Sequence, residues 1–353
     1  MRADSPASGP MASSKKPARD AAVLGALNVP PAALQPGLIV VGYSGGLDST
    51  VLLHGLKRQI AEAPAWRGYS LLAVHINHRL QPAAMPMEHH CRMQCQSLAL
   101  PLTVRRPTIS AGQKADLGIE AAARQARRLC LRSIFQQKKA RAIALAHHQD
   151  DLVETMLLQW MRGAGLEGLT AMQAVSPHED GLLWRPLLGC DKASLEAYAR
   201  VHRLSWMEDP SNALPDFDRN RLRQEVLPVL RQIRTGALAA MARSIGLLQD
   251  ARGLLESFTA EDLKACLTET DGTLRLQPLR ALGRQRMARV LRAWIASHGQ
   301  PMPPSRRLDE FGRQLETAGP ESRAQITVAP AVAGESGGFR VWLRAGFLHL
   351  DRL

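Results

Sequence analysis

The chain has 353 residues, which is enough for two domains that each bury a hydrophobic core. It has 45 lysine and arginine residues against 32 acidic ones, and the net charge of +13 favours nucleic acid as a partner, although a solvated basic surface has the same composition. Five cysteines without a C-x-x-C pair argue against a disulfide framework, and no apolar run reaches the roughly 18 residues that cross a bilayer. We therefore expect a cytoplasmic protein with no membrane partner.

Residues 1–36 are expected to form a disordered N-terminal extension. They are rich in serine, proline and alanine and lack the apolar segment of a secretory signal. From residue 37 short apolar runs alternate with longer amphipathic ones, which predicts strands that are each followed by a helix. Strands are predicted at 37–43, 71–77, 101–106, 140–146 and 182–187, and helices at 51–60, 85–98, 117–137 and 192–202. This order indicates an α/β fold with a doubly wound parallel sheet over residues 37–224.

The remaining chain is predicted to form a smaller helical domain over 225–322 and short strands over 323–353. Apolar residues recur at three and four positions in the helical part. Its basic residues fit either a nucleic-acid contact or a solvated helix face. They include Arg280, Arg284, Arg286, Arg289 and Arg292.

Three polar segments directly follow predicted strands, at residues 44–49, 75–79 and 147–151. Ligands of open parallel sheets bind beyond the carboxyl ends of the strands, so one pocket lined by all three segments is expected. Neither an H-E-x-x-H string nor a zinc-type Cys/His spacing is present.

The first of these segments has the composition of a phosphate-binding loop. Its residues are Ser44, Gly45, Gly46, Leu47, Asp48 and Ser49. The paired glycines let the backbone approach an anion, the following helix start attracts negative charge, and Asp48 is placed to hold Mg²⁺ through the phosphates. It is not a Walker A loop, since the lysine of that motif is absent. A plain strand-to-helix turn with an N-cap is the alternative.

The string S-G-G-x-D-S resembles the pyrophosphate loop of PP-loop ATPases, which cleave ATP to AMP and pyrophosphate while they adenylate a substrate. Four further strings, in order, are similar to the tRNA(Ile)-lysidine synthetase family. They are HINHRL at 75–80, EAAARQAR at 120–127, the block at 146–172 that begins AHHQDD, and RPLL at 185–188 with W-x-E-D-P-S-N at 206–212 and RNRLR at 219–223.

This resemblance implies an enzyme that joins lysine to C2 of the wobble cytidine of a CAU-anticodon tRNA(Ile), with ATP and Mg²⁺. The base is adenylated first, the lysine ε-amine then attacks, and AMP and pyrophosphate are released. Residues 37–224 would be the catalytic PP-loop domain and 225–322 a tRNA-binding domain. A PP-loop tRNA thiolase that acts on cytidine or uridine is the alternative enzyme, and a non-catalytic RNA-binding module the alternative of another class.

The resemblance also implies roles for individual residues. Asp48 would hold the metal, Arg124 and His147 would steady the adenylate, and Asp151 with Glu154 would bind and deprotonate lysine. From the residues alone, Asp151 and Glu154 share a helix face, but D-x-x-E is also a capping box. Substrate contacts are expected from His78, Arg127, Arg219 and Arg223.

The expected partners are tRNA(Ile) with a CAU anticodon and L-lysine. The oligomeric state stays open, with a homodimer as one option. Some family members have a longer C-terminal region with an additional RNA-binding domain, which this chain is too short to contain whole.

Overall fold

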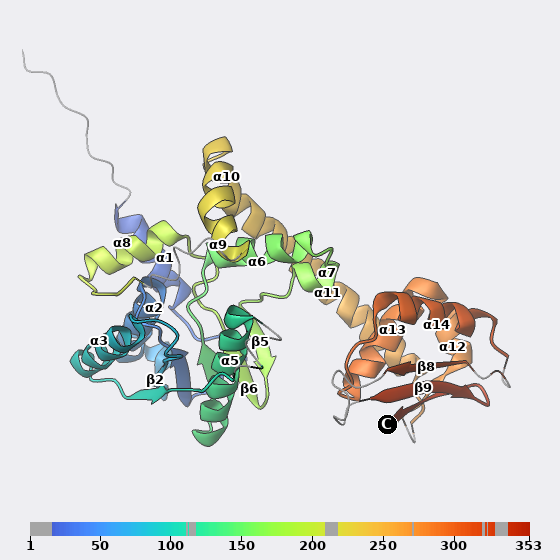
Figure 1. Ribbon diagram of the computed structural model, residues 1–353. Coiled ribbons are helices and arrows are strands. Elements are labelled where there is room, and N and C mark those ends of the chain that lie inside the picture. Colours follow the sequence, from blue (N-terminus) through green and yellow to red (C-terminus); the bar gives the residue numbers. More distant parts are fainter. Residues whose placement is uncertain are drawn as a thin grey trace, which may run out of the picture. The chain divides into compact units, whose positions relative to one another are not determined.

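The computed structural model describes residues 16–110, 112, 118–208, 218–269, 272–319, 322, 324–328 and 338–353 (Figure 1). The chain forms two compact units, Met1–Leu248 and Gln249–Leu353. The predicted turn at 209–212 lies outside the described residues. No helix in the described part is both long enough and apolar enough to cross a membrane.

The first unit contains a six-stranded sheet in the order β3-β2-β1-β4-β6-β5. The strands are β1 (Leu38–Gly42), β2 (Ser70–Ile76), β3 (Leu102–Arg105), β4 (Ala142–Ala144), β5 (Val175–His178) and β6 (Gly181–Trp184). All neighbours pair in parallel except β5 and β6, which form an antiparallel hairpin at one edge. The predicted parallel α/β sheet is confirmed, whereas β5 was missed because its sequence, VSPH, contains a proline and little apolar character.

Helices cover both faces of this sheet, and further helices of the unit pack on those helices. They are α1 (Lys16–Ala26), α2 (Leu47–Glu62), α3 (Ala84–Ser97), α5 (Ile119–Gln137), α6 (Gln149–Met161), α7 (Leu166–Leu169), α8 (Lys192–Val201), α9 (Asp218–Arg221) and α10 (Leu227–Ile233), with a 3₁₀ turn at Pro64–Trp66 and a π turn at Leu222–Val226. Alternate residues of β1 point to opposite faces. Ile39 and Val41 pack in the core that α1, α2, α3 and α8 share, and Val40 packs against α5.

Part of the N-terminal extension is folded, contrary to the expectation of disorder over 1–36. Helix α1 occupies Lys16–Ala26, and Val23, Leu27 and Leu34 are buried in the main core. The Trp66 indole donates a hydrogen bond to the Leu27 carbonyl oxygen at 3.0 Å. Composition suggested disorder because the segment contains few apolar residues, but their four-residue spacing puts Val23 and Leu27 on one helix face.

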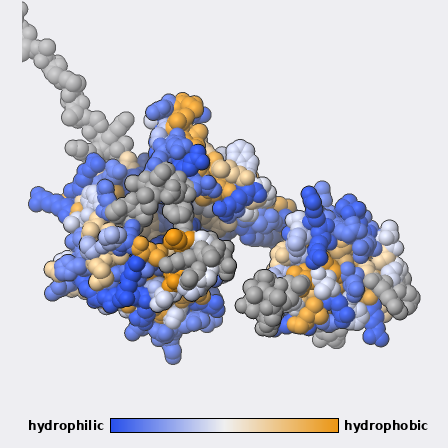
Figure 2. Space-filling model, viewed as in Figure 1, coloured by the Kyte–Doolittle hydropathy of each residue, from blue (hydrophilic) through white to orange (hydrophobic). Residues whose placement is uncertain are grey.

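Helix α11 (Ala237–Cys266) contains the boundary between the two units, which differs from the predicted boundary at 224/225. The first unit extends to Leu248 because α10 and the start of α11 pack on α6. Leu227 and Leu238 share a small core with Val153 of α6. Helix α10 exposes the apolar side chains of Val229 and Ile233. Figure 2 shows an orange patch over this helix.

The second unit combines helices and strands around one core. Its helices are α12 (Leu276–Ala281), α13 (Gly283–Ser297) and α14 (Ser305–Thr317), and its antiparallel sheet has the order β7-β10-β9-β8, with β7 (Leu274–Arg275), β8 (Gln325–Val328), β9 (Phe339–Arg344) and β10 (Phe347–Arg352). Trp294 and Phe311 of the helices share a core with Phe339 and Leu348 of the strands. The helices and the C-terminal strands are thus one domain, although a separation at residue 322 was expected.

Candidate active site

The three polar segments that were predicted to share a pocket follow β1, β2 and β4, which are neighbours in the sheet. Because these strands are parallel, their carboxyl ends meet at one edge. Residues 44–46 lead from β1 into α2, and residues 145–148 lead from β4 into α6. Side chains from both loops contact one another, as described below.

The loop after β1 is held in shape by its own hydroxyl groups. The Ser44 and Ser49 hydroxyls lie 3.0 Å apart, and the Ser49 hydroxyl donates to the Gly46 carbonyl oxygen at 3.0 Å. Thr50 donates to the same oxygen at 2.9 Å. Ser49 and Thr50 are buried while Ser44 is exposed. The two buried hydroxyls therefore shape the loop, and Ser44 is the hydroxyl that faces solvent.

Two glycines leave room at the centre of this loop. Gly45 has φ of +87°, and a Cβ atom added there would lie 2.8 Å from the Cys91 thiol. The Gly45 carbonyl oxygen also accepts a hydrogen bond from the Met207 amide at 3.0 Å. Gly46 is the N-cap of α2 and provides no side-chain cap. The first-turn amides of α2 therefore form an uncapped helix start, which suits an anion.

Asp48 lies in the first turn of α2 and is paired with a residue that sequence reasoning did not select. The Lys192 ammonium lies 2.7 Å from the Asp48 carboxylate. Lys192 is the first residue of α8, directly after the N-cap Asp191. A lysine is unfavourable at a helix N-terminus, because the helix dipole is positive there. The position of Lys192 at the start of α8 was therefore the sequence signal that this residue has a role outside the helix.

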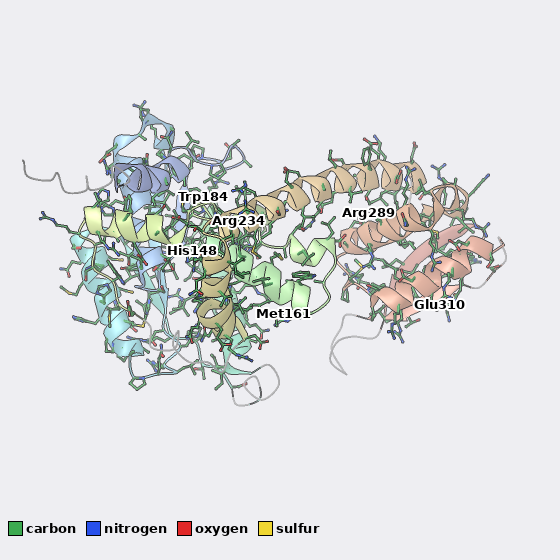
Figure 3. The ribbon with its side chains drawn as sticks, turned by 90° about the horizontal axis from the view of Figure 1, so that it is seen from above. His148, Met161, Trp184, Arg234, Arg289 and Glu310 are labelled. Atoms are coloured by element: carbon green, nitrogen blue, oxygen red, sulfur yellow. The ribbon has the colours of Figure 1, made fainter. Side chains whose placement is uncertain are left out.

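His148, rather than His147, lies between the two acidic segments. It is 4% exposed, and its Nε2 atom lies 3.7 Å from Asp48 and 3.6 Å from Asp151. Its Nδ1 atom accepts a hydrogen bond from the Asp150 amide, and Asp151 accepts one from the His148 amide. The capping box of α6 is therefore formed by His148 and Asp151, not by the D-x-x-E pair (Figure 3 labels His148 within the first unit).

Glu154 is completely buried and is engaged by two arginines. Its carboxylate accepts a hydrogen bond from Arg219 Nε at 3.0 Å and one from Arg223 Nε at 2.8 Å. Burial would lower the pKa of Arg223, but Glu154 and Asp151 raise it above the usual value. Glu154, which was expected to bind lysine, is thus bonded to Arg219 and Arg223, which were expected to contact the substrate. A buried carboxylate needs charged partners of this kind.

Asp151 is the more accessible of the two carboxylates. Its side chain is 13% exposed, and one oxygen lies 3.3 Å from Arg223. Burial acts to raise its pKa, but His148, His147 and the His148 amide outweigh burial and lower the pKa, so the group is ionised at neutral pH. The neighbouring Asp150 forms an ion pair with Arg231 at 2.5 Å.

His147 is held as a neutral ring. Arg185 Nε donates a hydrogen bond to its Nδ1 atom at 3.2 Å, and Arg185 also donates to the Gln173 carbonyl oxygen at 2.7 Å. Burial, aided by Arg185, Arg219 and Arg124, lowers the pKa of His147 to about 4. Since Nδ1 accepts, the proton of the neutral ring is on Nε2, which is then a hydrogen-bond donor.

The end of β2 and the segment after it contribute two histidines, His75 and His78. Both ring nitrogens of His78 are buried and have no hydrogen-bond partner among the described residues, and burial with the nearby Arg127 lowers its pKa to about 4. His75 is buried, with Nδ1 3.0 Å from the Tyr43 carbonyl oxygen, in keeping with a structural role. Arg124 and Arg127 are exposed on α5. Arg124 helps to lower the pKa of His147, and Arg127 helps to lower the pKa values of His78 and His75.

Most of the basic residues noted on the second unit have internal partners. Arg280 donates to two carbonyl oxygens, Arg286 pairs with Asp262 at 2.5 Å, and Arg289 donates to Thr259. These bonds join helices within the unit, so the row of arginines is in part structural. No group of three or more His, Cys, Asp or Glu side chains suited to a metal ion occurs among the described residues.

Two family matches cover much of the chain. Residues 24–230 match the family described as PP-loop domain, and residues 274–334 match the TilS substrate binding domain. The first match spans the loop at 44–49 and every residue of the cluster around His148.

Curated relatives match most of the chain. A tRNA(Ile)-lysidine synthase from Xanthomonas axonopodis pv. citri is 44% identical over 274 residues, covering 77% of this chain and 60% of the relative. One from Pseudomonas aeruginosa is 43% identical over 264 residues, covering 72% and 58%. The chain thus spans about 60% of the length of these relatives.

Among solved structures, the U34-tRNA thiolase NcsA from Methanococcus maripaludis is similar in fold, with a TM-score of 0.56 at 15% identity over 66% of this chain and 80% of that one. The sheet order, the uncapped glycine loop and the family match agree with one another. The chain therefore belongs to the PP-loop family, and its curated relatives in that family are named tRNA(Ile)-lysidine synthase.

Proposed function

We propose that this chain contains the catalytic part of a tRNA(Ile)-lysidine synthase. The reaction joins lysine to C2 of the wobble cytidine of a CAU-anticodon tRNA(Ile), and it consumes ATP. The observation that carries the proposal is the cluster of Asp48, His148 and Asp151 beside the uncapped start of α2, in a chain 40–44% identical to relatives of that name.

The loop at 44–49 suits the phosphates of ATP. Gly45 and Gly46 keep side chains away from its centre, and the first-turn amides of α2 point their positive ends towards it. Asp48 lies in the same turn and is 32% exposed, so it can contribute the single carboxylate that Mg²⁺ needs beside phosphate oxygens. Mg²⁺ held there would neutralise charge on the departing pyrophosphate.

Asp151 is proposed as the group that binds the lysine amine. It is ionised, partly exposed and 3.6 Å from His148, so an ammonium can pair with it. Glu154 is proposed to act indirectly, because it is buried and both of its oxygens are engaged. Its arginines connect α6 to the segment that begins at residue 218, and Arg219 also helps to lower the pKa of Asp151.

His147 and Arg124 are proposed to steady the adenylated base. The cytidine C2 oxygen attacks the α-phosphorus of ATP and pyrophosphate leaves. The lysine ammonium gives one proton to Asp151, and the free amine then attacks C2, releases a second proton to solvent and displaces AMP. A neutral His147 with its proton on Nε2 can donate to an oxygen of this adenylate but cannot accept a proton at neutral pH. The exposed Arg124 lies near enough to lower the pKa of His147 and can pair with the phosphate.

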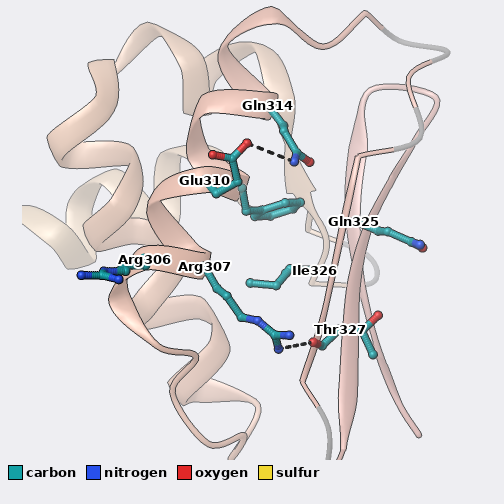
Figure 4. Close-up of a pocket in the computed structure, with 8 residues that line it drawn as sticks. Arg306, Arg307, Glu310, Gln314, Gln325, Ile326 and Thr327 are labelled. Atoms are coloured by element: carbon teal, nitrogen blue, oxygen red, sulfur yellow. Dashed lines mark hydrogen bonds between the residues drawn. The ribbon is translucent and has the colours of Figure 1, made fainter.

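Contacts with the body of the tRNA are proposed for the second unit. A hollow of about 420 Å³ lies between α14 and β8, within the segment that matches the TilS substrate binding domain. Figure 4 shows Arg307 reaching towards Thr327, to whose carbonyl oxygen it donates at 3.2 Å, while Arg306 points away from the strand. The net charge of +13 supports a polyanionic partner for the whole chain.

A tRNA thiolase is the alternative function, because the thiolase NcsA has a similar fold. Thiolase chemistry would need accessible, ionisable thiols or a cysteine-bound cluster. Cys91 and Cys95 are buried on α3, and burial raises the pKa of both thiols, to about 11 for Cys95. Cys91 packs under Gly45, where it fills space below the loop. These features favour the lysine ligase.

The test is incubation of the protein with ATP, Mg²⁺, labelled lysine and an unmodified CAU-anticodon tRNA(Ile) transcript. A transcript with uridine at the wobble position is the control. Label in the first transcript and none in the second is expected. Release of AMP without transfer of lysine to either transcript would contradict the proposal and would favour the thiolase alternative.

A further inference from the structure

Helix α8 is fixed against α2, so Lys192 is presented to the phosphate loop in a defined position. Leu195 and Tyr198 of α8 belong to the main core, and the Tyr198 hydroxyl lies 3.0 Å from Nδ1 of His54 on α2. Lys192 begins α8, and Asp48 lies in the first turn of α2. The two helices therefore start side by side, with a cation on one and a carboxylate on the other.

The pair between Lys192 and Asp48 has the features of an exchangeable contact. The two side chains are 37% and 32% exposed, and a single 2.7 Å bond joins them. Ion pairs that are exposed to this extent contribute little to stability, because solvent screens the two charges. By contrast Lys57, which lies in the middle of α2, is bonded to the Leu98 carbonyl oxygen. Lys192 is thus a cation at the loop that can change partners at small cost.

The loop itself has no lysine, although ATP brings several negative charges to it. In other nucleotide-binding loops a lysine supplied by the loop neutralises the β- and γ-phosphates. Here the loop has glycines and hydroxyls, and its one charged residue, Asp48, repels phosphate. A cation from another element can offset this charge alongside Mg²⁺, and Lys192 is the lysine that contacts Asp48.

We propose that Lys192 binds the β- and γ-phosphates of ATP, and that it leaves Asp48 when it does so. The inference rests on the proposed use of the loop for ATP. With Lys192 on the phosphates, the Asp48 oxygen that had bonded Lys192 becomes able to hold Mg²⁺. The pair would then keep the loop neutral in the empty enzyme and release both charges together when nucleotide enters.

The test measures equilibrium binding of pyrophosphate and of AMP by calorimetry, without and with Mg²⁺, for the wild type, Lys192→Met and Lys192→Arg. Pyrophosphate should bind about 10- to 100-fold more weakly to Lys192→Met, the loss typical of a charge-assisted hydrogen bond. AMP should bind equally to all three proteins because it lacks the β- and γ-phosphates. Lys192→Arg should retain most of the pyrophosphate affinity.

Two further variants sharpen the result. Asp48→Asn should bind metal-free pyrophosphate more tightly than the wild type, because Lys192 no longer has to leave a carboxylate. Arg200→Met removes a cation from the exposed side of the same helix, where Arg200 pairs with Glu196, and should leave both affinities unchanged. Thermal unfolding of each variant checks that the fold is intact.

Three outcomes would overturn the assignment. Equal pyrophosphate affinity of Lys192→Met and the wild type would show that Lys192 does not touch the phosphates. Equal losses for AMP and pyrophosphate would mean that the lysine shapes the whole pocket. If the wild type binds neither pyrophosphate nor ATP, the loop is not a phosphate site, and the proposed function falls together with the role of Lys192.

Discussion

Replacement of Glu154 by glutamine separates an anchoring role from direct binding of lysine. Glu154 is fully buried, and three hydrogen bonds from Arg219 and Arg223 end on it, at 2.8 to 3.0 Å. Breaking a buried ion pair costs about 3 to 5 kcal/mol. Here Arg223 is 37% exposed and Asp151 remains as a neighbour, so a loss of about 2 to 3 kcal/mol is expected. In a domain of this size that lowers Tm by roughly 4 to 12 °C.

The assay is thermal unfolding together with lysine titration of the reaction. We expect Glu154→Gln to lower Tm, and Asp151→Asn to raise KM for lysine with a smaller effect on Tm. Glu196→Gln is the matched control, since its exposed pair with Arg200 should contribute about 0 to 1 kcal/mol. A Glu154→Gln protein with unchanged Tm and a raised KM for lysine would refute the anchoring role.

Three other predictions concern the loop, a buried carboxylate and a histidine. Gly45→Ala should weaken ATP binding at least about tenfold, measured by calorimetry, because its Cβ would lie 2.8 Å from a buried thiol at a φ of +87°. The hydrogen bond with Arg106 is the main reason that the pKa of Glu88 is lowered to about 2. The ionised carboxylate therefore contributes about 2 kcal/mol to the free energy of unfolding above pH 4.5, and this contribution is lost as the pH falls through about 2. In denaturant titrations, the difference in stability between the wild type and Glu88→Gln should shrink on acidification. His147, with a pKa of about 4, should stay neutral from pH 5 to 8 with Nδ1 unprotonated in ¹⁵N NMR, and a second tautomer should appear in Arg185→Met.

The parallel sheet and the loop at its edge were predictable because both depend on local patterns. Buried strands such as 37–43 are nearly continuous apolar runs, and two glycines followed by Asp48 mark a turn into a helix. The folded part of the N-terminus and the edge strand β5 were not predictable in this way. Their few apolar residues, such as Val23 and Leu27, become informative only when the core that receives them is known.

Sequence patterns select candidate site residues, but they do not show which of these residues pair with one another. Sequence spacing put Asp151 and Glu154 on one helix face, and the structure adds that Glu154 turns inward to Arg219 and Arg223. Those partners are separated from it by more than 60 residues, so no local pattern connects them. Lys192 escaped notice for the same reason, since its partner Asp48 is 144 positions away.

The measurement that tests the central claim most directly is mass spectrometry of the wobble nucleoside. A CAU-anticodon tRNA(Ile) transcript would be incubated with the protein, ATP, Mg²⁺ and lysine, then digested to nucleosides. The account predicts that the wobble cytidine is replaced by an adduct in which lysine has displaced the C2 oxygen, and that the adduct is absent when lysine is omitted. An unchanged cytidine, or one that exchanges oxygen for sulfur when a sulfur donor is supplied, would contradict it.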